Sequence, residues 1–175
     1  MVTTHTERAS LELLTIYQVS QILGSSLDVN KTFREALNVL VSMMGWRRGA
    51  VILQTEEGLL NGMCAVGLSQ NESTRLTFAA GEGVGGQVFR SGIPAVVPDI
   101  QNEPLFLNRS GAADQSPHET IAYIATPIKA NRRTLGVLTM DRVVTPYSSV
   151  FEEDLRLLTM VASLLGQNLL LHRAV

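Results

Sequence analysis

Apolar residues repeat at helical spacing near the start of the chain. A first helix is expected over Arg8–Leu23, with a break at residues 24–26. A second helix is expected after Asp28, whose side chain can cap it, and Gly45 ends it. The expected buried face of the first helix consists of Leu13, Ile16, Val19 and Leu23, flanked by Leu11 and Leu14. That of the second helix consists of Val29, Phe33, Leu37, Leu40 and Met44.

Short apolar runs between turn residues predict an antiparallel sheet in the middle of the chain. The runs 50–53 and 59–66 flank Glu56-Glu57-Gly58, which predicts a hairpin. Segments 71–77 and 101–118 are expected to be loops, the second one with a single helical turn. Further strands are expected at Leu76–Ala79, Ala95–Val97, Thr120–Ile128 and Thr134–Arg142, with a bulge or a strand end at Pro127.

The last helix is expected to begin with a capping box, because Ser149 and Glu152 form the S-x-x-E pattern. It carries two apolar stripes, of which one can cover the sheet. We expect the other stripe to contact the first helix and its symmetry mate in a homodimer. The residues assigned to this dimer and signalling helix are Leu155, Leu158, Val161, Leu165 and Leu169. The alternative is that both stripes are buried within one chain, against the first two helices.

The length of 175 residues fits one domain. We expect a tail and helix start at residues 1–12, a single domain at 13–172 and the start of a truncated linker helix at 173–175. The net charge of −2 argues against direct contact with nucleic acid. No uninterrupted apolar run reaches the roughly 18 residues of a membrane helix, so no membrane contact is expected. The single cysteine, Cys64, fits a reducing cytoplasm.

Three glycines resemble a dinucleotide-binding fingerprint. Gly81, Gly83 and Gly86 satisfy the pattern G-x-G-x-x-G. A dinucleotide fold needs a crossover helix of a dozen or more residues after such glycines. Here Gly92-Ile93-Pro94 stops the helix after about two turns. The glycines are therefore interpreted as a turn that leads into a short helix packed on a sheet.

This glycine turn and the strands after it resemble the core signature of GAF domains. The segments that carry the resemblance are Gly83–Gly86, Arg90–Pro94, Val96–Asp99, Thr126–Ile128, Leu135–Leu138 and Met140–Arg142. The resemblance covers about Leu13–Leu171 and implies an α+β, GAF-like fold. Its central antiparallel sheet of about six strands would have the N-terminal and C-terminal helices on one face and short helices and loops on the other. GAF domains are small sensory domains, so the resemblance implies regulation.

The segment Glu103–Arg109 narrows the resemblance. Together with Leu138–Arg142 it resembles the GAF domains of sigma-54-dependent activators, especially the Nif-specific regulatory proteins. This implies that ligand or partner binding changes the packing of dimer helices and so controls an adjacent ATPase domain. The implied partners are a second copy, a PII-type signalling protein or an antiactivator flavoprotein. Alternatives are a GAF sensor of a histidine kinase or of another sigma-54 activator, or an enzyme of the methionine sulfoxide reductase type.

No group of residues predicts catalysis or a metal site, so no enzyme activity is expected. His5, His118 and His172 lie on a tail, a loop and a helix end, without the spacing of metal ligands. Ser110, Asp114 and His118 share one expected loop that lacks the elbow and oxyanion-hole signals of hydrolases.

The single cysteine also limits the alternatives. Cys64 is interpreted as a small apolar residue in an alternating strand. Reductases that resemble GAF domains use several cysteines, and bilin attachment needs a cysteine later in the chain. Cyclic nucleotide binding is disfavoured because Asp141-Arg142 stands where the corresponding signature has Asn-Lys.

The GAF resemblance implies a small-molecule pocket between the sheet and about residues 83–119. The candidate ligand-binding residues are Phe89, Arg90, Val97, Phe106, Leu107, Arg109, Tyr123 and Met140. An anionic effector such as 2-oxoglutarate would need an arginine, and Arg109 and Arg90 are the candidates. No other cofactor is expected. The alternatives are that each arginine braces a loop, that Phe106 and Leu107 fill the core, and that the domain holds no ligand.

Overall fold

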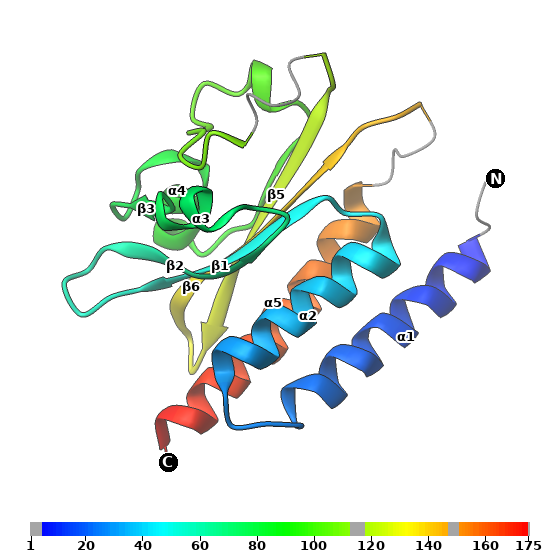
Figure 1. Cartoon of the computed structure of the whole chain (residues 1–175), viewed down its shortest axis with the longest axis vertical. Coiled ribbons are helices and arrows are strands. Elements are labelled where there is room, and N and C mark those ends of the chain that lie inside the picture. Colours follow the sequence, from blue (N-terminus) through cyan, green and yellow to red (C-terminus); the bar gives the residue numbers. More distant parts are fainter. Residues whose placement is uncertain (1–4, 113–117, 147–150, 175) are drawn as a thin grey trace.

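The centre of the computed structural model, which describes residues 5–112, 118–146 and 151–174, is a six-stranded antiparallel sheet (Figure 1). Its strand order is β3-β2-β1-β6-β5-β4. The strands are β1 (Arg48–Gln54), β2 (Leu60–Val66), β3 (Thr77–Phe78), β4 (Ala95–Val97), β5 (Ile121–Ala130) and β6 (Arg133–Val143). The helices are α1 (His5–Leu23), α2 (Val29–Met44), α3 (Gln70–Thr74), α4 (Gly83–Ser91) and α5 (Phe151–Ala174), with a 3-10 turn at Ile100–Asn102. The predicted α+β fold is confirmed.

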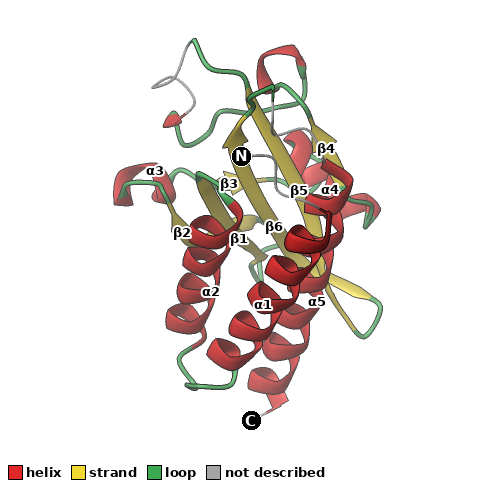
Figure 2. Cartoon of the chain, turned by 90° about the vertical axis from the view of Figure 1, so that its right-hand side faces the viewer, coloured by secondary structure: helices red, strands yellow, loops and turns green. Residues whose placement is uncertain are grey.

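Three long helices cover one face of the sheet, which is called the helix face below (Figure 2). Helices α2 and α5 pack on the strands, and α1 packs on the outside against both of them. Arg8 near the start of α1 pairs with Asp154 near the start of α5. At the other end, Asn168 Nδ2 donates a hydrogen bond to the Leu23 carbonyl oxygen at 3.1 Å. These two contacts show that α1 and α5 run parallel.

The helix face carries the larger apolar core, and the opposite face, called the loop face below, carries two smaller clusters. Alternating strand residues serve the two faces, so that Val51 and Leu138 contact the helices while Ile52 and Val137 contact the loops. The largest buried side chains of the helices are Phe33, Leu37 and Leu40 in α2 and Leu157, Leu158 and Leu165 in α5. The loop-face clusters consist of Val84, Val88, Val97, Ile100, Ile121, Ala125 and Val137, and of Ala50, Ile52, Leu60 and Phe78.

Helix α5 packs closely on strand β5. A Cβ atom at Gly166 would overlap the carbonyl oxygen of Lys129, so the glycine lets the two backbones approach each other. Glycine inside a helix is less favourable than alanine by about 1 kcal/mol, and this contact explains its presence. By length and composition α5 is apolar enough to cross a membrane. Some of those apolar residues, including Leu157, Leu158 and Leu165, are buried in the helix-face core. Met160, Leu170 and Leu171 are exposed.

The predicted inner face of α1 needs a correction. Leu13, which was expected inside, is 71% exposed. Glu12 takes an inner position because Arg8 and Arg156 both pair with it, which compensates for the removal of its carboxylate from water. The buried residues of the helix are Glu12, Thr15, Val19 and Leu23. The outer side of α1 is left with an exposed apolar group formed by Leu13, Leu14 and Tyr17.

The second stripe of α5 also needs a correction. Most of both stripes is buried within one chain, as in the alternative that the sequence left open, and Leu171 near the end of the helix is exposed. Four of the residues assigned to the dimer face, Leu158, Val161, Leu165 and Leu169, are at most 6% exposed. The fifth, Leu155, is partly buried against the same core. Because α1 and α2 already complete the cover, these side chains form no open surface for a second copy.

Two local features lie outside the expected pattern or refine it. Helix α3 forms where a loop was expected, because Ser69 and Glu72 make a reciprocal capping box. Pro127 lies beyond the residues of β5 that pair with β4, so its missing N–H leaves no bond unmade there. A register shift follows between Ile128 and Lys129, as the proline predicted. Ser149, the expected cap of α5, lies outside the described residues.

Candidate functional site

A small cavity, called the loop-face cavity below, lies between the loop face of the sheet and segment 103–110. Its volume is about 60 Å³. Enclosed small-molecule sites usually measure about 300–1,000 Å³, so this cavity has room for only a few water molecules. The lining residues are Arg48, Gly49, Ala50, Ile52, Leu68, Leu76, Phe78, Phe106, Leu107, Asn108, Arg109, Ser110, Tyr123, Thr139, Met140 and Asp141.

Five of the eight candidate ligand-binding residues line this cavity: Phe106, Leu107, Arg109, Tyr123 and Met140. The rings of Phe106 and Tyr123 meet edge to face, with centroids 5.1 Å apart and an interplanar angle of 74°. Met140 is almost fully buried, and its side chain belongs to the helix-face core. The aromatic pair is therefore the main apolar wall, and Met140 closes the cavity from the strand.

The other three candidates lie outside the cavity. Phe89 packs under α4 between the two loop-face clusters, and Val97 is buried in one of them. The Arg90 Nη2 donates a hydrogen bond to the carbonyl oxygen of Ala80 at 3.0 Å. Arg90 therefore braces the glycine turn, which agrees with the structural alternative for this side chain.

An ion pair that the sequence analysis missed forms the polar end of the cavity. The Arg48 Nε lies 2.8 and 3.0 Å from the two carboxylate oxygens of Asp141, its direct partner across β1 and β6. Arg48 is 6% exposed. Burial raises the pKa of the Asp141 carboxyl, and Arg48, with Arg47, opposes that rise. The signal available in the sequence was a charged residue at the edge of an apolar strand, at position 48.

Tyr123 connects the aromatic wall to this polar end. It lies opposite Asp141 in the pairing of β5 with β6, so Tyr123, Asp141 and Arg48 form one row across three strands. Its hydroxyl is hydrogen-bonded to the side chain of Thr139. Burial is the main reason that the pKa of Tyr123 is raised, and the nearby Asp141 adds to the effect. Tyr123 is therefore a neutral hydrogen-bonding group at neutral pH.

Segment 103–110 is held over the cavity by contacts with the glycine turn. Arg109 pairs with Glu82, and its guanidinium also lies 5.9 Å from the centroid of the Phe78 ring. Glu82 in turn accepts a hydrogen bond from the Ala79 N–H at 2.8 Å. A Cβ atom on Gly83 would lie 3.0 Å from a methyl carbon of Leu107, so the glycine allows the loop to sit closely on the turn.

The glycine pattern at the turn serves packing within the chain. Gly81 has a φ of +87°, which favours glycine, and the Arg90 guanidinium covers it. A Cβ atom on Gly86 would lie 2.7 Å from the Ala79 carbonyl oxygen. Helix α4 has nine residues, and the sheet around it is antiparallel. The geometry of a dinucleotide site is therefore not present in the described part of the chain.

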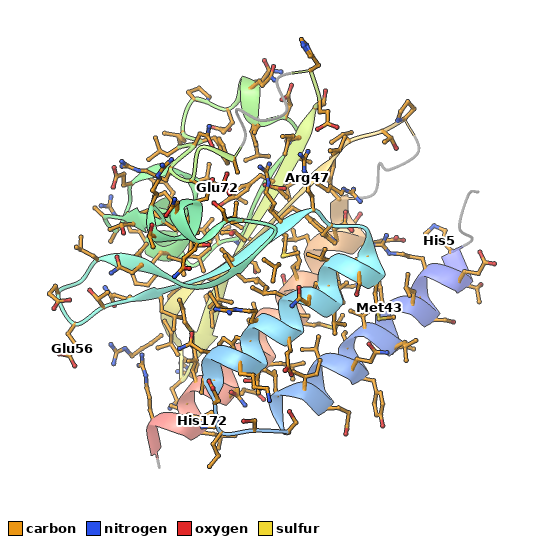
Figure 3. All side chains as sticks on the ribbon, in the orientation of Figure 1. His5, Met43, Arg47, Glu56, Glu72 and His172 are labelled. Carbon is orange, nitrogen blue, oxygen red and sulfur yellow. The ribbon has the colours of Figure 1, made fainter. Side chains whose placement is uncertain are left out.

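The histidines and the cysteine of the described residues lie apart from one another. In the described ranges no group of three or more His, Cys, Asp or Glu residues is placed to hold a metal ion. His5 and His172 lie at opposite ends of the helical layer (Figure 3). Cys64 is buried in the helix-face core, and burial raises the pKa of its thiol to about 11, so it is protonated at neutral pH. Asp114 lies outside the described residues.

Relatives with high similarity are named as regulators of nitrogen fixation. The chain is 45% identical to the Nif-specific regulatory protein of Azospirillum brasilense over 168 residues, which covers 95% of this chain and 27% of that protein. It is 43% identical to the Nif-specific regulatory protein of Herbaspirillum seropedicae over 166 residues, with 95% and 31% covered. The chain thus spans little more than a quarter of the length of these relatives.

Solved structures share the whole fold. The GAF domain of Nlh2 from A. aeolicus in an inactive state superposes with a TM-score of 0.84 at 26% identity, covering 94% of this chain and 98% of that one. A free methionine-R-sulfoxide reductase from Neisseria meningitidis in complex with its substrate gives 0.79 at 21% identity, covering 98% and 95%, and shows likeness of fold alone. The sequence pattern of the GAF domain matches residues 28–169. The chain belongs to the GAF domain family and is homologous to a region of the Nif-specific regulatory proteins.

Proposed function

We propose that this chain is the regulatory domain of a sigma-54-dependent activator of nitrogen-fixation genes and controls an adjacent ATPase domain. The observation that carries the proposal is the 43–45% identity to Nif-specific regulatory proteins over 95% of the chain. The two relatives are longer than this chain, which leaves room in them for the domains that such control requires. A cytoplasmic location follows from this role and agrees with the single, reduced Cys64.

Replacement of a homologous region tests this function. This chain would be exchanged for the matching region of the Azospirillum brasilense regulator, and a nif-promoter reporter would be measured under nitrogen-limited and nitrogen-replete conditions. We expect the reporter to keep its response to nitrogen. A reporter that is equally active in both conditions, although the hybrid protein is present at normal level, counts against the proposal.

The loop-face cavity is the proposed effector site. Arg48 and Arg109 offer two guanidinium groups to a carboxylate ligand such as 2-oxoglutarate, and Phe106 and Tyr123 offer apolar walls. At about 60 Å³ the cavity is too small for such a ligand, so binding requires segment 103–110 to move outward. The exposed Glu82–Arg109 pair is the contact that must open. Calorimetry with 2-oxoglutarate tests this, and the absence of heat at millimolar concentration would exclude that ligand.

A role without catalysis is part of the same proposal. The protonated, buried Cys64 is the only cysteine of the chain, and the reductase neighbour at 21% identity shares the fold alone. A turnover assay with free methionine sulfoxide and a thiol reductant provides the test. Turnover by the unchanged chain would contradict the proposal. Turnover that persists in Cys64→Ala would contradict it as well, because the reaction would then use another group.

The outer face of α1 is the proposed dimer surface, in place of the buried stripe of α5. Leu13, Leu14 and Tyr17 are exposed on one side of this helix and would be covered by the same residues of a second copy. A PII-type signalling protein or an antiactivator protein would then bind the dimer. Light scattering of the chain and of the variant Leu13→Lys gives the test. A wild-type chain that stays monomeric at high concentration contradicts the dimer.

A further inference from the structure

Two adjacent residues of β6 carry opposite charges to opposite faces of the sheet. Asp141 points to the loop face, where it pairs with Arg48 at the polar end of the loop-face cavity. Arg142, the next residue, points to the helix face, where its Nη2 lies 2.8 Å from Asp154 of α5. Side chains alternate along a strand, so a single peptide unit joins the two ion pairs.

Asp154 is the centre of the charge cluster on the helix face. Its side chain is fully buried and is held by two arginines from different elements, Arg142 of β6 at 2.8 Å and Arg8 of α1 at 2.6 Å. The Arg142 guanidinium also lies over the rings of Trp46 and Phe151, at 5.4 and 5.3 Å from their centroids. A buried carboxylate that loses one of its partners is strongly destabilised. A displacement of either Arg142 or Arg8 therefore also weakens the contact of Asp154 with the other arginine.

The first half of α1 contacts α5 through several ion pairs, beside the partly buried side chains of Leu11 and Ile16. Arg8 contacts Glu12 of its own helix and both Glu153 and Asp154 of α5. Glu12 also pairs with Arg156, at 3.2 Å. The buried apolar residues of α1, Val19 and Leu23, both lie in its second half. Residues 5–16 therefore dock on α5 through ion pairs and without a fully buried apolar side chain of their own.

We propose that the Asp141–Arg142 step of β6 couples the loop-face cavity to the docking of residues 5–16 on α5. Loss of the Arg48–Asp141 pair shifts β6 at Asp141, and Arg142 moves with it because one peptide unit joins them. Asp154 then holds Arg8 less firmly, and residues 5–16 detach more often. The proposal builds on the proposed function in one respect: a carboxylate that enters the cavity would compete with Asp141 for Arg48. The coupling itself is a property of the chain without ligand.

Hydrogen exchange on the unliganded chain tests the coupling. The variant Asp141→Asn removes the charge that faces the cavity and touches no residue of α1. We expect amide exchange of residues 5–16 to become at least fivefold faster, while exchange in α2 changes less than twofold. The matched control is Glu82→Gln, which breaks the other ion pair at the cavity, Glu82–Arg109, and should leave residues 5–16 unchanged.

The same coupling must be visible from the other end, because energetic coupling between two sites is reciprocal. The variant Arg8→Ala lies on the outer helix and keeps the cavity residues intact, so it remains informative if Asp141→Asn does not fold. We expect it to speed exchange at residues 139–142 of β6 at least twofold, with residues 60–66 of β2 unchanged. Exchange that becomes faster throughout the chain in either variant overturns the proposal. So does unchanged exchange at residues 5–16 in a folded Asp141→Asn variant, or at residues 139–142 in a folded Arg8→Ala variant. A calorimetric titration in which 2-oxoglutarate does not bind would count against the proposed effector, but it would not change the outcome of these exchange measurements.

Discussion

The two faces of the sheet are built in different ways. The helix face has one continuous apolar core under three long helices, with Asp154 as its fully buried charge. The loop face has two smaller clusters, a residual cavity and a covering segment that is held by the Glu82–Arg109 pair. A continuous core resists deformation, whereas small clusters joined by polar contacts open locally at lower free energy. The helix face supplies stability, and the loop face supplies a surface that can rearrange.

The largest expected difference between the two faces is in the loss of stability when a leucine side chain is shortened to alanine. The change Leu158→Ala should lower the free energy of unfolding by about 2–5 kcal/mol, because Leu158 is fully buried and the structure around a deleted side chain relaxes only in part. Leu107→Ala on the loop face should have less than half that effect, because Leu107 is only partly buried. Urea unfolding monitored by circular dichroism measures both variants. Equal losses would contradict the assigned division between the faces.

Ionisation of Cys64 places a charge inside the helix face. Burial raises the pKa of this thiol from 9.0 to about 11 in the folded chain. The folded state therefore keeps the proton longer than the unfolded state does, and stability is retained below pH 9 and lost as the pH rises to about 11. The loss should be on the order of 2–3 kcal/mol. Urea midpoints measured from pH 8 to pH 11 detect it, with Cys64→Ala as the variant in which this component must disappear.

A pair of glycine substitutions sharpens the description of the helix face. Gly166→Ala inserts a methyl group against the Lys129 carbonyl oxygen and should destabilise the chain by about 1–3 kcal/mol. Gly24→Ala is the matched control, because its added Cβ would meet only ordinary contacts of 3.7 Å or more and its φ is not positive. That control should be neutral or stabilising by about 0.4–1 kcal/mol. Thermal unfolding compares them, and similar midpoints would refute the close contact of α5 with β5.

The smallest effect on stability is expected at the contact that covers the cavity. Arg109→Ala removes an exposed ion pair and should change the free energy of unfolding by about 0–1 kcal/mol. The same variant should increase amide exchange in segment 103–110, because Arg109 ties this segment to the glycine turn. Mass spectrometry of exchanged peptides provides the measurement. An unchanged segment 103–110 would mean that its other contacts, among them the Phe106–Tyr123 ring pair and Leu107, hold it in place without Arg109.

The fold could be predicted where apolar spacing and turn residues agree. Helix α2, the hairpin of β1 and β2, and strands β4, β5 and β6 follow directly from such patterns. The inner face of α1 could not, because Glu12 and Thr15 take buried positions through partners that lie far away in sequence or on the same helix. The apolar spacing along α5 predicts a second stripe that needs cover, but it does not show which segment provides that cover. The prediction of a second copy at this stripe is wrong for that reason.

The candidate site was predictable only in part for a related reason. Phe106, Leu107, Arg109 and Tyr123 line the cavity, and the family resemblance pointed to all four. Arg48 was missed because it becomes part of the site only through pairing of β1 with β6, some ninety positions later in the chain. Phe89, Arg90 and Val97 are close in sequence to residues that line the cavity, but their side chains lie elsewhere. Phe89 and Val97 pack in the loop-face clusters, and Arg90 contacts the glycine turn. Tertiary pairing, rather than residue type, decides which of these side chains reach the same space.

The strand order also has a consequence for folding during synthesis on the ribosome. The two central strands, β1 and β6, are separated by roughly 80 residues, and α5 comes last of all. At a synthesis rate of about 5–20 residues per second, β1 waits roughly 4–16 s for its neighbour to be made. During that interval α2 can pack on the hairpin of β1 and β2, but the edge of β1 that pairs with β6 has no partner. The nascent chain therefore exposes an unpaired strand edge for several seconds, and chaperones can bind it before α5 has been synthesised.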